Sequence, residues 1–128
     1  MEHLLDTHAL IWAATDVTRL SKRALAGIAD ERNKLCVSAA SAWEIATKVR
    51  LGKLKEAEEL EADFVTLISE AGFKLISIST EHALRAGRLR GNHRDPWDRM
   101  IAAQALALDI PVISNDKDLE EFGVRRIW

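Results

Sequence analysis

The sequence predicts an α/β fold in which helices cover both faces of a mostly parallel sheet of about five strands. Five short apolar segments recur along the chain, and stretches with helical spacing of apolar residues separate them. Parallel strands need such crossover helices, and right-handed crossovers place helices on both faces of the sheet. The expected strands cover residues 3–5, 34–37, 74–78, 111–113 and 124–127.

The helices expected between these strands begin at residues that cap helices well. Ser38 or Ser41 can start a helix that Gly52 ends, because a serine oxygen accepts from free backbone amides and glycine suits a helix end. Asp95 followed by Pro96 is a strong start, since proline fits the first helical turn. The expected helices cover residues 38 or 41 to 50, 56–70, a stretch from 80 through 86, 95–109 and a short helix at 117–122.

The composition indicates one soluble domain. With 128 residues, 48% hydrophobic and 30% charged, the chain can bury a core without disulfides, and we expect a single domain over residues 1–128. The only cysteine, Cys36, lies in an apolar segment and is expected to be buried. No apolar run approaches the roughly 20 residues that span a bilayer, and the N-terminus lacks signal-peptide features. We therefore expect a cytoplasmic protein without membrane contact.

Four acidic residues are expected to meet at one end of the sheet. Asp6 follows the first strand, Glu44 lies on the helix after the second, Asp98 opens the helix before the fourth, and Asp116 follows the fourth. In open parallel sheets, ligands bind beyond the carboxyl ends of the strands. Carboxylates gathered in a partly buried cleft repel one another, and a hard divalent cation such as Mg²⁺ relieves that repulsion.

Each of these acids also has a structural alternative. Asp6 and Asp116 can cap the helices that follow them, and Asp98 can complete a capping box begun by Asp95. Glu44 can be a solvated residue of an amphipathic helix, although its apolar neighbours make that an unusual place. Asp95 is best explained as a helix cap. The four acids taken together favour the metal site, while no one of them decides it.

Four segments of the chain resemble a known family. They are LLDTHALIW at residues 4–12, SAASAWEI at 38–45, HRDPWDRMIAAQA at 93–105 and SND at 114–116. In this order and spacing they resemble the PIN-domain ribonucleases, more narrowly the VapC-type toxins of type II toxin–antitoxin systems, along the whole chain. The resemblance implies a PIN-like three-layer α/β/α sandwich. One departure is Trp97, which stands where phenylalanine is common.

The resemblance also implies an activity and a set of site residues. Asp6, Glu44, Asp98 and Asp116 would be both the catalytic residues and the metal ligands, with Ser114 in support and Asp95 ranked below them. The implied enzyme is an endoribonuclease that uses Mg²⁺, with Mn²⁺ as a substitute, and a metal-activated water to hydrolyse phosphodiester bonds of transfer RNA or other structured RNA. The number of metal ions and a contribution from Asp118 stay open.

The implied partners are a VapB-like antitoxin, an RNA substrate and a second copy of the chain, within a larger toxin–antitoxin assembly. The acidic helix at 56–70 either covers the core or forms part of a groove for an antitoxin segment. Arginines crowd residues 85–99, where they form either a solvated surface or a grip on RNA phosphates. The candidate substrate contacts are Arg94, Arg99 and Lys48.

Tryptophans at helical spacing suggest core positions. Trp12 and Trp43 are expected in the core, whereas Trp97 either packs beneath the acidic site or stacks on a base, and packing is preferred. His8 and His93 are expected to be polar neighbours of the site.

Three other functions compete with this prediction. A phospho-receiver domain also has acids at strand ends, but the third expected strand here ends without an acid and Asp6 stands alone after the first. A PIN-like module that only binds protein is disfavoured because all four acids are present. A PIN nuclease of RNA processing that works without an antitoxin is the closest alternative.

Overall fold

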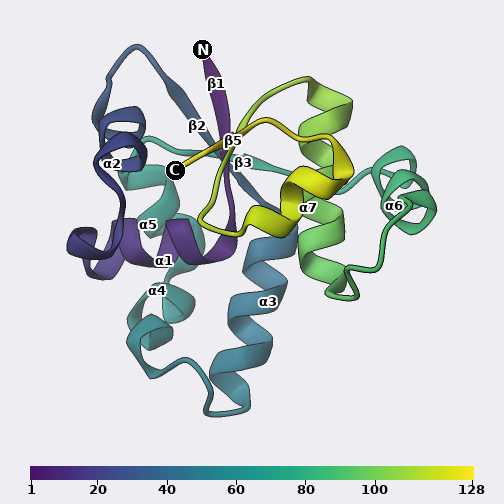
Figure 1. Ribbon diagram of the computed structural model, residues 1–128. Coiled ribbons are helices and arrows are strands. Elements are labelled where there is room, and N and C mark those ends of the chain that lie inside the picture. The colour runs from purple at the N-terminus through teal and green to yellow at the C-terminus, as the bar shows by residue number, and fades with distance from the viewer.

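A computed structural model describes residues 1–128, and its five strands form one all-parallel sheet (Figure 1). The strands are β1 (Glu2–Leu5), β2 (Lys34–Ser38), β3 (Lys74–Ile76), β4 (Val112–Ile113) and β5 (Arg126–Ile127). Their order across the sheet is β3-β2-β1-β4-β5. The expected fold class is confirmed, while the third and fifth strands are two residues shorter than expected, at the end of β3 and at the start of β5.

Seven α-helices surround the sheet. They are α1 (Thr7–Thr15), α2 (Lys22–Ala29), α3 (Ala39–Arg50), α4 (Glu58–Ala62), α5 (Phe64–Glu70), α6 (Thr80–Arg88) and α7 (Pro96–Leu108). Short 3-10 helices at Val17–Arg19, Lys55–Ala57 and Lys117–Phe122 complete the chain. None of the helices combines the length and the apolar character that crossing a membrane requires.

Alternate residues of the strands lie in two separate cores, one on each face of the sheet. Leu5, Val37 and Ile113 lie in the core shared with α1, α2, α4 and α5, whereas Leu4 and Val112 lie in the core shared with α7. This follows from the period of two in a strand, which sends neighbouring side chains to opposite faces. The two cores make the three layers of an α/β/α sandwich. Cys36 is buried in the second core as expected, and burial raises the pKa of its thiol.

The segment 56–70 is not the single helix that the spacing predicted. Asp63, with φ −134° and ψ 41°, separates α4 from α5, so the chain changes direction there. The break lets both halves bury a residue in the same core, since Leu60 of α4 and Ile68 of α5 are 5% and 2% exposed. The prediction was wrong because apolar spacing reports which residues are buried and does not report that the helix axis stays straight. The helix α2 was not predicted at all.

Two helix starts position the site described below. Ser38 caps α3, since its Oγ accepts from the amide of Ala40 at 3.0 Å, which decides between the two expected serines. Asp95 caps α7 as expected: its Oδ1 accepts from the amides of Trp97 at 2.9 Å and Asp98 at 3.2 Å. The helix α7 then runs back alongside the sheet, and its first turn lies at the end of the sheet where β1 and β4 finish (Figure 1).

Truncation of a buried side chain of α7 is expected to destabilise the fold. Ile101 is 1% exposed in the second core, so Ile101→Ala is expected to lower the free energy of unfolding by about 2–5 kcal/mol through lost burial and a cavity. Leu108 lies on the same helix but is 42% exposed, and Leu108→Ala is the matched control, with a change within about 0.5 kcal/mol. Urea unfolding of both variants measures the difference. Equal effects would show that α7 is not packed as described.

Candidate metal-binding site

The site lies where neighbouring strands β1 and β4 end. From β1 the chain goes to β2 on one side of the sheet, while β4 pairs with β1 on the other side, which makes this pair the switch point of the topology. Asp6 comes directly after β1, and its amide donates to the carbonyl of Ile113 at the end of β4, at 3.1 Å. Asp6 is thereby fixed between the two strand ends.

Asp6 caps α1 and also faces the site. Its Oδ1 accepts from the amide of Ala9 at 2.8 Å, which confirms the structural alternative. That cap uses only one of the two carboxylate oxygens. Asp6 is largely buried, with 6% of its surface exposed. The start of α1 is tied to α3 by a 3.0 Å hydrogen bond between the hydroxyls of Thr7 and Ser41. Asp6 therefore caps α1 and also lies where a metal ligand is expected.

Glu44 is buried on α3, in contrast to the solvated alternative. The residue is 3% exposed, and its Oε2 accepts a hydrogen bond from the Lys48 ammonium one turn later. Its Oε1 is buried without any hydrogen-bond partner. An unpaired buried carboxylate oxygen is costly, because burial removes its water without a replacement.

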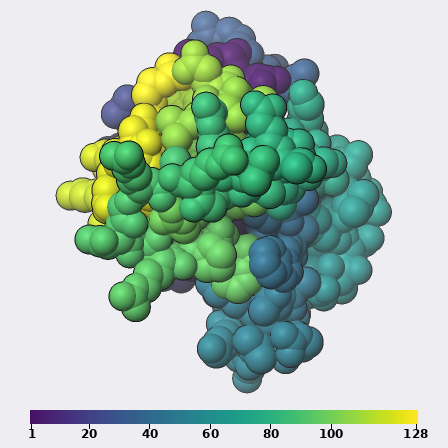
Figure 2. Space-filling model, turned by 90° about the vertical axis from the view of Figure 1, so that its right-hand side faces the viewer, coloured from purple at the N-terminus to yellow at the C-terminus, as the bar shows by residue number.

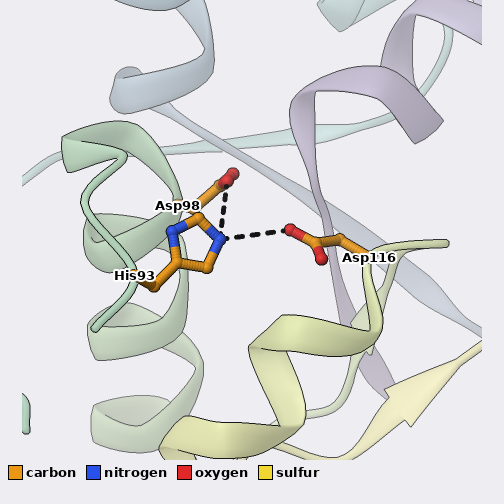
Figure 3. Close-up of side chains that lie close together, drawn as sticks. All are labelled: His93, Asp98 and Asp116. Carbon is orange, nitrogen blue, oxygen red and sulfur yellow. Dashed lines mark hydrogen bonds and ion pairs between the residues drawn. The ribbon is translucent and has the colours of Figure 1, made fainter. Parts of the chain in front are cut away.

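Asp98 and Asp116 meet around a histidine (Figure 3). Asp98 comes from the first turn of α7 and Asp116 from the loop after β4, and His93 Nε2 lies 3.3 Å from a carboxylate oxygen of each. Asp116 Oδ1 also accepts from the amide of Asp118 at 2.9 Å, so it caps the 3-10 helix as its structural alternative predicted. The buried Ser114 hydroxyl accepts from the amide of Asp116 at 3.0 Å and so supports that loop.

All four expected acids line one polar cleft. The cleft has a volume of about 390 Å³ and no apolar residue in its lining. The lining residues are Asp6, His8, Glu44, Lys48, Asp95, Asp98, Asn115, Asp116 and Lys117. Helices α1 and α7 both begin here, and the positive end of a helix dipole favours negative charge nearby. Segments distant in sequence thus bring four carboxylates together, as the strand-end argument predicted.

The raised pKa values of two of the acids reflect burial first and repulsion from neighbouring acids second. Burial, together with the charges of Asp95 and Glu44, raises the pKa of Asp98 to about 7. Burial raises the pKa of Asp6 as well, although hydrogen bonding to Ser114 and to the Ala9 amide works against it. Burial lowers the pKa of His93, but its hydrogen bond with Asp116 and the surrounding acids outweigh this and raise it. The cleft therefore holds more negative charge than its own cations balance.

The donor set fits a small hard divalent cation. His93, Asp98 and Asp116 each offer a ligand atom within 4.8 Å of the others, and Glu44, whose buried Oε1 has no partner, lines the same cleft. Carboxylate oxygens with few other donors are the ligands that Mg²⁺ prefers, and its charge would stabilise the ionised form of Asp98. Asp118 is exposed, and the cleft lining does not include it.

The candidate substrate contacts divide into two kinds. Arg94 is exposed and Lys48 lines the cleft, so both stay candidates. Arg99 is used differently: its guanidinium donates to the carbonyls of Ala86 at 3.3 Å, of His93 at 2.9 Å and of Leu89. These bonds close the loop between α6 and α7 and leave Arg99 a structural role in holding His93.

Sequence reasoning misplaced one aromatic residue and undervalued one histidine. Trp43 is not in the core but 59% exposed, and it packs edge to face against Trp97 at 5.3 Å between ring centroids. Trp12 packs against the first core as expected and is only partly buried. His93 was expected to be a mere polar neighbour, yet it bridges two of the acids. Its closeness to Asp95 and Asp98 in sequence was the available signal, but a loop residue has no periodicity from which its direction follows.

A family model identifies the chain. The model for the PIN domain matches residues 3–124. The chain belongs to the PIN domain family. No curated protein sequence matches it.

Solved structures share this PIN fold over nearly the whole chain. A chain of VapBC2 from Rickettsia felis, bound to a DNA fragment from its promoter, gives a TM-score of 0.71 at 17% identity, covering 98% of this chain and 97% of that one. DNA-bound VapBC from Salmonella typhimurium gives 0.68 at 21%, covering 98% and 96%. VapC20 from Mycobacterium tuberculosis, a toxin that cleaves the sarcin–ricin loop, gives 0.68 at 14%, covering 95% of each chain.

The stability of the metal-free PIN domain is expected to fall with pH through Asp98. A carboxyl group whose pKa is raised from 3.8 to about 7 on folding binds its proton more tightly in the folded state, so its contribution is lost as the pH rises through that window. His93, whose pKa is raised, acts in the same direction. In EDTA, the melting temperature of Asp98→Asn minus that of the wild type is expected to rise by about 5 °C between pH 4.5 and pH 8.

The control for this measurement is Asp109→Asn. Asp109 follows the far end of α7, its side chain is 96% exposed, and its left-handed φ of 53° also suits asparagine. Its difference from the wild type is expected to stay flat with pH. His3, whose pKa burial lowers, acts in the opposite sense but is present in every variant. A flat difference for Asp98→Asn would contradict the repulsion inferred for the cleft.

Substitution of Arg99 is expected to affect the stability of the fold more than substrate binding. Lysine cannot span the three carbonyls that the guanidinium fork reaches, so Arg99→Lys is expected to lower the free energy of unfolding by about 2 kcal/mol. Arg94→Lys, at the neighbouring exposed arginine, is the control and should leave the melting temperature unchanged. Calorimetry on both variants decides between the two roles; an unchanged melting temperature for Arg99→Lys would return it to the substrate contacts.

Proposed function

We propose that this PIN domain is a magnesium-dependent endoribonuclease and the toxin of a type II toxin–antitoxin pair. The observation that carries the proposal is the cleft in which Asp6, Glu44, Asp98 and Asp116 converge from four separate segments. The matched structures support it, because they include toxin–antitoxin complexes and a toxin that cleaves an RNA loop. RNA of defined structure, such as transfer RNA, is the substrate class proposed.

The four acids would hold the ion, with Mn²⁺ as a substitute for Mg²⁺. When bound, the ion supplies Lewis-acid chemistry, lowering the pKa of water and offsetting negative charge that develops on the phosphate. Ser114 keeps Asp116 in place through the loop amide, and Asp95 fixes the first turn of α7 that carries Asp98. The side chains thereby arrive in position before substrate binds, which limits reorganisation during the reaction.

The chain's own residues favour water as the nucleophile. The serines of this region are buried and engaged, since Ser38 donates to Gln104 Oε1, Ser41 shares a hydrogen bond with Thr7, and Ser114 accepts from the Asp116 amide. Cys36 is buried in the core with a raised pKa, so it carries little thiolate. The Lys48 ammonium bonded to Glu44 adds positive charge at the edge of the cleft, where it can attract an RNA phosphate.

A VapB-like antitoxin is the proposed partner, with a homodimer of the toxin inside the larger assembly. An apolar hollow of about 360 Å³ lies between α1, α4 and α5 and includes Leu10, Leu60 and Leu67. An amphipathic helix of a partner is recognised by such a groove through apolar residues at helical spacing. With such a partner and substrate, the activity is proposed to be cytoplasmic.

Cleavage of RNA is expected to need both the cation and the acids. Purified antitoxin-free protein should cut a labelled pool of structured RNAs in Mg²⁺ or Mn²⁺ and not in EDTA. Asp6→Asn and Asp98→Asn remove a charged ligand from the cleft, and each is expected to lower the rate by at least about 100-fold. Mg²⁺ is also expected to raise the melting temperature of the wild type at pH 8 more than that of either variant.

Two exposed acids provide the controls for the cleavage assay. Asp109→Asn, at the far end of α7, should retain full cleavage, and Asp118→Asn should too, because Asp118 is outside the cleft lining. Cleavage that persists in both ligand variants would indicate a contaminant or a misassigned site. A well-folded protein that binds Mg²⁺ and cuts no RNA would support a PIN module that only binds protein. Cleavage without an antitoxin gene beside the toxin gene would favour an RNA-processing nuclease.

A further inference from the structure

A second hollow lies beside the acid cleft, between α3, α6 and α7. It has a volume of about 200 Å³ and is mostly apolar, with Trp43, Gly87, Pro96 and Met100 in its lining. Figure 2 shows this side of the molecule, with α6 in front and α3 below it. The hollow is smaller than the roughly 300–1,000 Å³ of sites for drug-sized ligands, so a single planar ring suits it better than a whole cofactor.

Residues close together in the sequence connect this hollow to the acid cleft. Trp43 lines the hollow and Glu44 lines the cleft, while Pro96 lines the hollow and Asp98 the cleft. The Trp97 ring joins the two: Trp43 packs against it at 5.3 Å, and Lys48, which binds Glu44, lies 5.5 Å from its centroid. A nucleotide next to a phosphate held in the cleft would therefore meet the hollow first.

The Trp43 ring is exposed, although the next two residues, Glu44 and Ile45, are both buried. Trp43 is 59% exposed, so its ring leaves a large apolar surface in water at the mouth of the hollow. Single-stranded RNA is recognised by aromatic side chains on which unstacked bases stack, because every base offers an apolar face. The ring is thus placed where a base could cover it.

Positive charges that suit the backbone of the same strand lie on α6, whose Gly87 lines the hollow. Arg85, Arg88, Arg90 and Arg94 lie on α6 and the loop after it, are exposed, and take part in none of the ion pairs of the protein. Three of these arginines line a separate hollow on α6. The whole chain has a net charge of −2, so this positive segment is local. Unpaired arginines bind phosphates through charge-assisted hydrogen bonds. An apolar hollow beside the acid cleft, with unpaired arginines elsewhere on α6, fits a nucleic acid better than an apolar partner surface.

We infer that the hollow lined by Trp43 and Gly87 binds one unstacked base of the RNA strand, adjacent to the phosphate that is cut. The inference deepens the proposed function and rests on it for the substrate class. The base would lie against the Trp43 ring, with the backbone on the arginines of α6. The hollow would then help to decide where the strand is cut, because it fixes one base relative to the acids.

The test fills the hollow or removes its ring. A Cβ at Gly87 would meet no atom within 4 Å, so Gly87→Leu adds a side chain to open space, and Gly87→Ala is its small control. Trp43→Ala removes the ring and Trp43→Phe keeps an aromatic face. Leu51→Ala, at another exposed apolar residue at the end of α3, controls for lost surface. For the binding measurements the variants are made on an Asp116→Asn background, in which cleavage is expected to be lost. Gly87→Leu is also made in the wild-type background for the cleavage kinetics.

The probes are fluorescein-labelled oligouridylate, oligoadenylate and an abasic ribose-phosphate oligomer of the same length. Binding of each probe is measured by fluorescence anisotropy in Mg²⁺. Gly87→Leu and Trp43→Ala are expected to weaken binding of at least one base-bearing RNA by about tenfold and to leave the abasic oligomer unchanged. The three control variants should stay within about twofold of the background protein, because they keep the aromatic face or the open hollow. In an RNA that the wild type cuts, one abasic position beside the cut should lower kcat/KM for the wild type but not for Gly87→Leu.

Two results would overturn the inference. Equal losses on base-bearing and abasic oligomers would mean that the hollow does not bind a base. If Trp43→Ala instead halves the mass in sedimentation while the preference for bases persists, the face joins two copies of the chain. Base-dependent binding in a protein that never cleaves RNA would leave this inference standing and refute only the proposed activity. Normal cleavage with no base-dependent loss in the variants would refute only this inference.

Discussion

The rest of the site depends on the repulsion among four carboxylates gathered at the ends of β1 and β4. Asp6 and Glu44 are 6% and 3% exposed, and burial of charge is costly unless each charge is paired. Each acid has a partner that offsets only part of this cost: the Ala9 amide for Asp6, Lys48 for Glu44, and His93 for both Asp98 and Asp116. The part of the cost that these partners do not offset appears in Asp98, whose pKa is raised to about 7. The divalent cation proposed for the cleft would offset this remaining cost.

The structural and chemical roles of these acids use different oxygen atoms. Asp116 accepts from the Asp118 amide through Oδ1 while Oδ2 faces His93, and Asp6 caps α1 through Oδ1 alone. Helix capping therefore orients each carboxylate without consuming it, and the cap also locks the rotamer that a metal site requires. Asp95 differs because its Oδ1 serves two amides of α7, which matches its lower rank among the candidates. A residue that explains a helix start can thus still be a ligand.

The sequence predicted those parts of the molecule that follow from local pattern and strand ends. The apolar segments located five parallel strands, and the acids at the strand ends located the cleft, because parallel strands deliver their carboxyl ends to one edge. It failed where the outcome depends on what covers a surface or where a loop turns. Trp43 has the spacing of a core residue, but no element covers it, and His93 lies in a loop shaped by Arg99 bonds that pattern does not report. The break at Asp63 is likewise a tertiary effect, since it lets α4 and α5 each bury a residue in the same core.

Helix geometry links the cleft to the apolar hollow beside it. Successive residues of an α-helix point about 100° apart, so one turn of α3 can present Trp43 to the hollow and Glu44 to the acids. The first turn of α7 does the same with Pro96 and Asp98, and the Trp97 ring fills the space between. A shift of either helix that moved the acids would also move the walls of the hollow. The positions of Glu44 and Asp98 in the cleft and of the walls of the hollow are therefore set by the same two helices, and neither can change without the other.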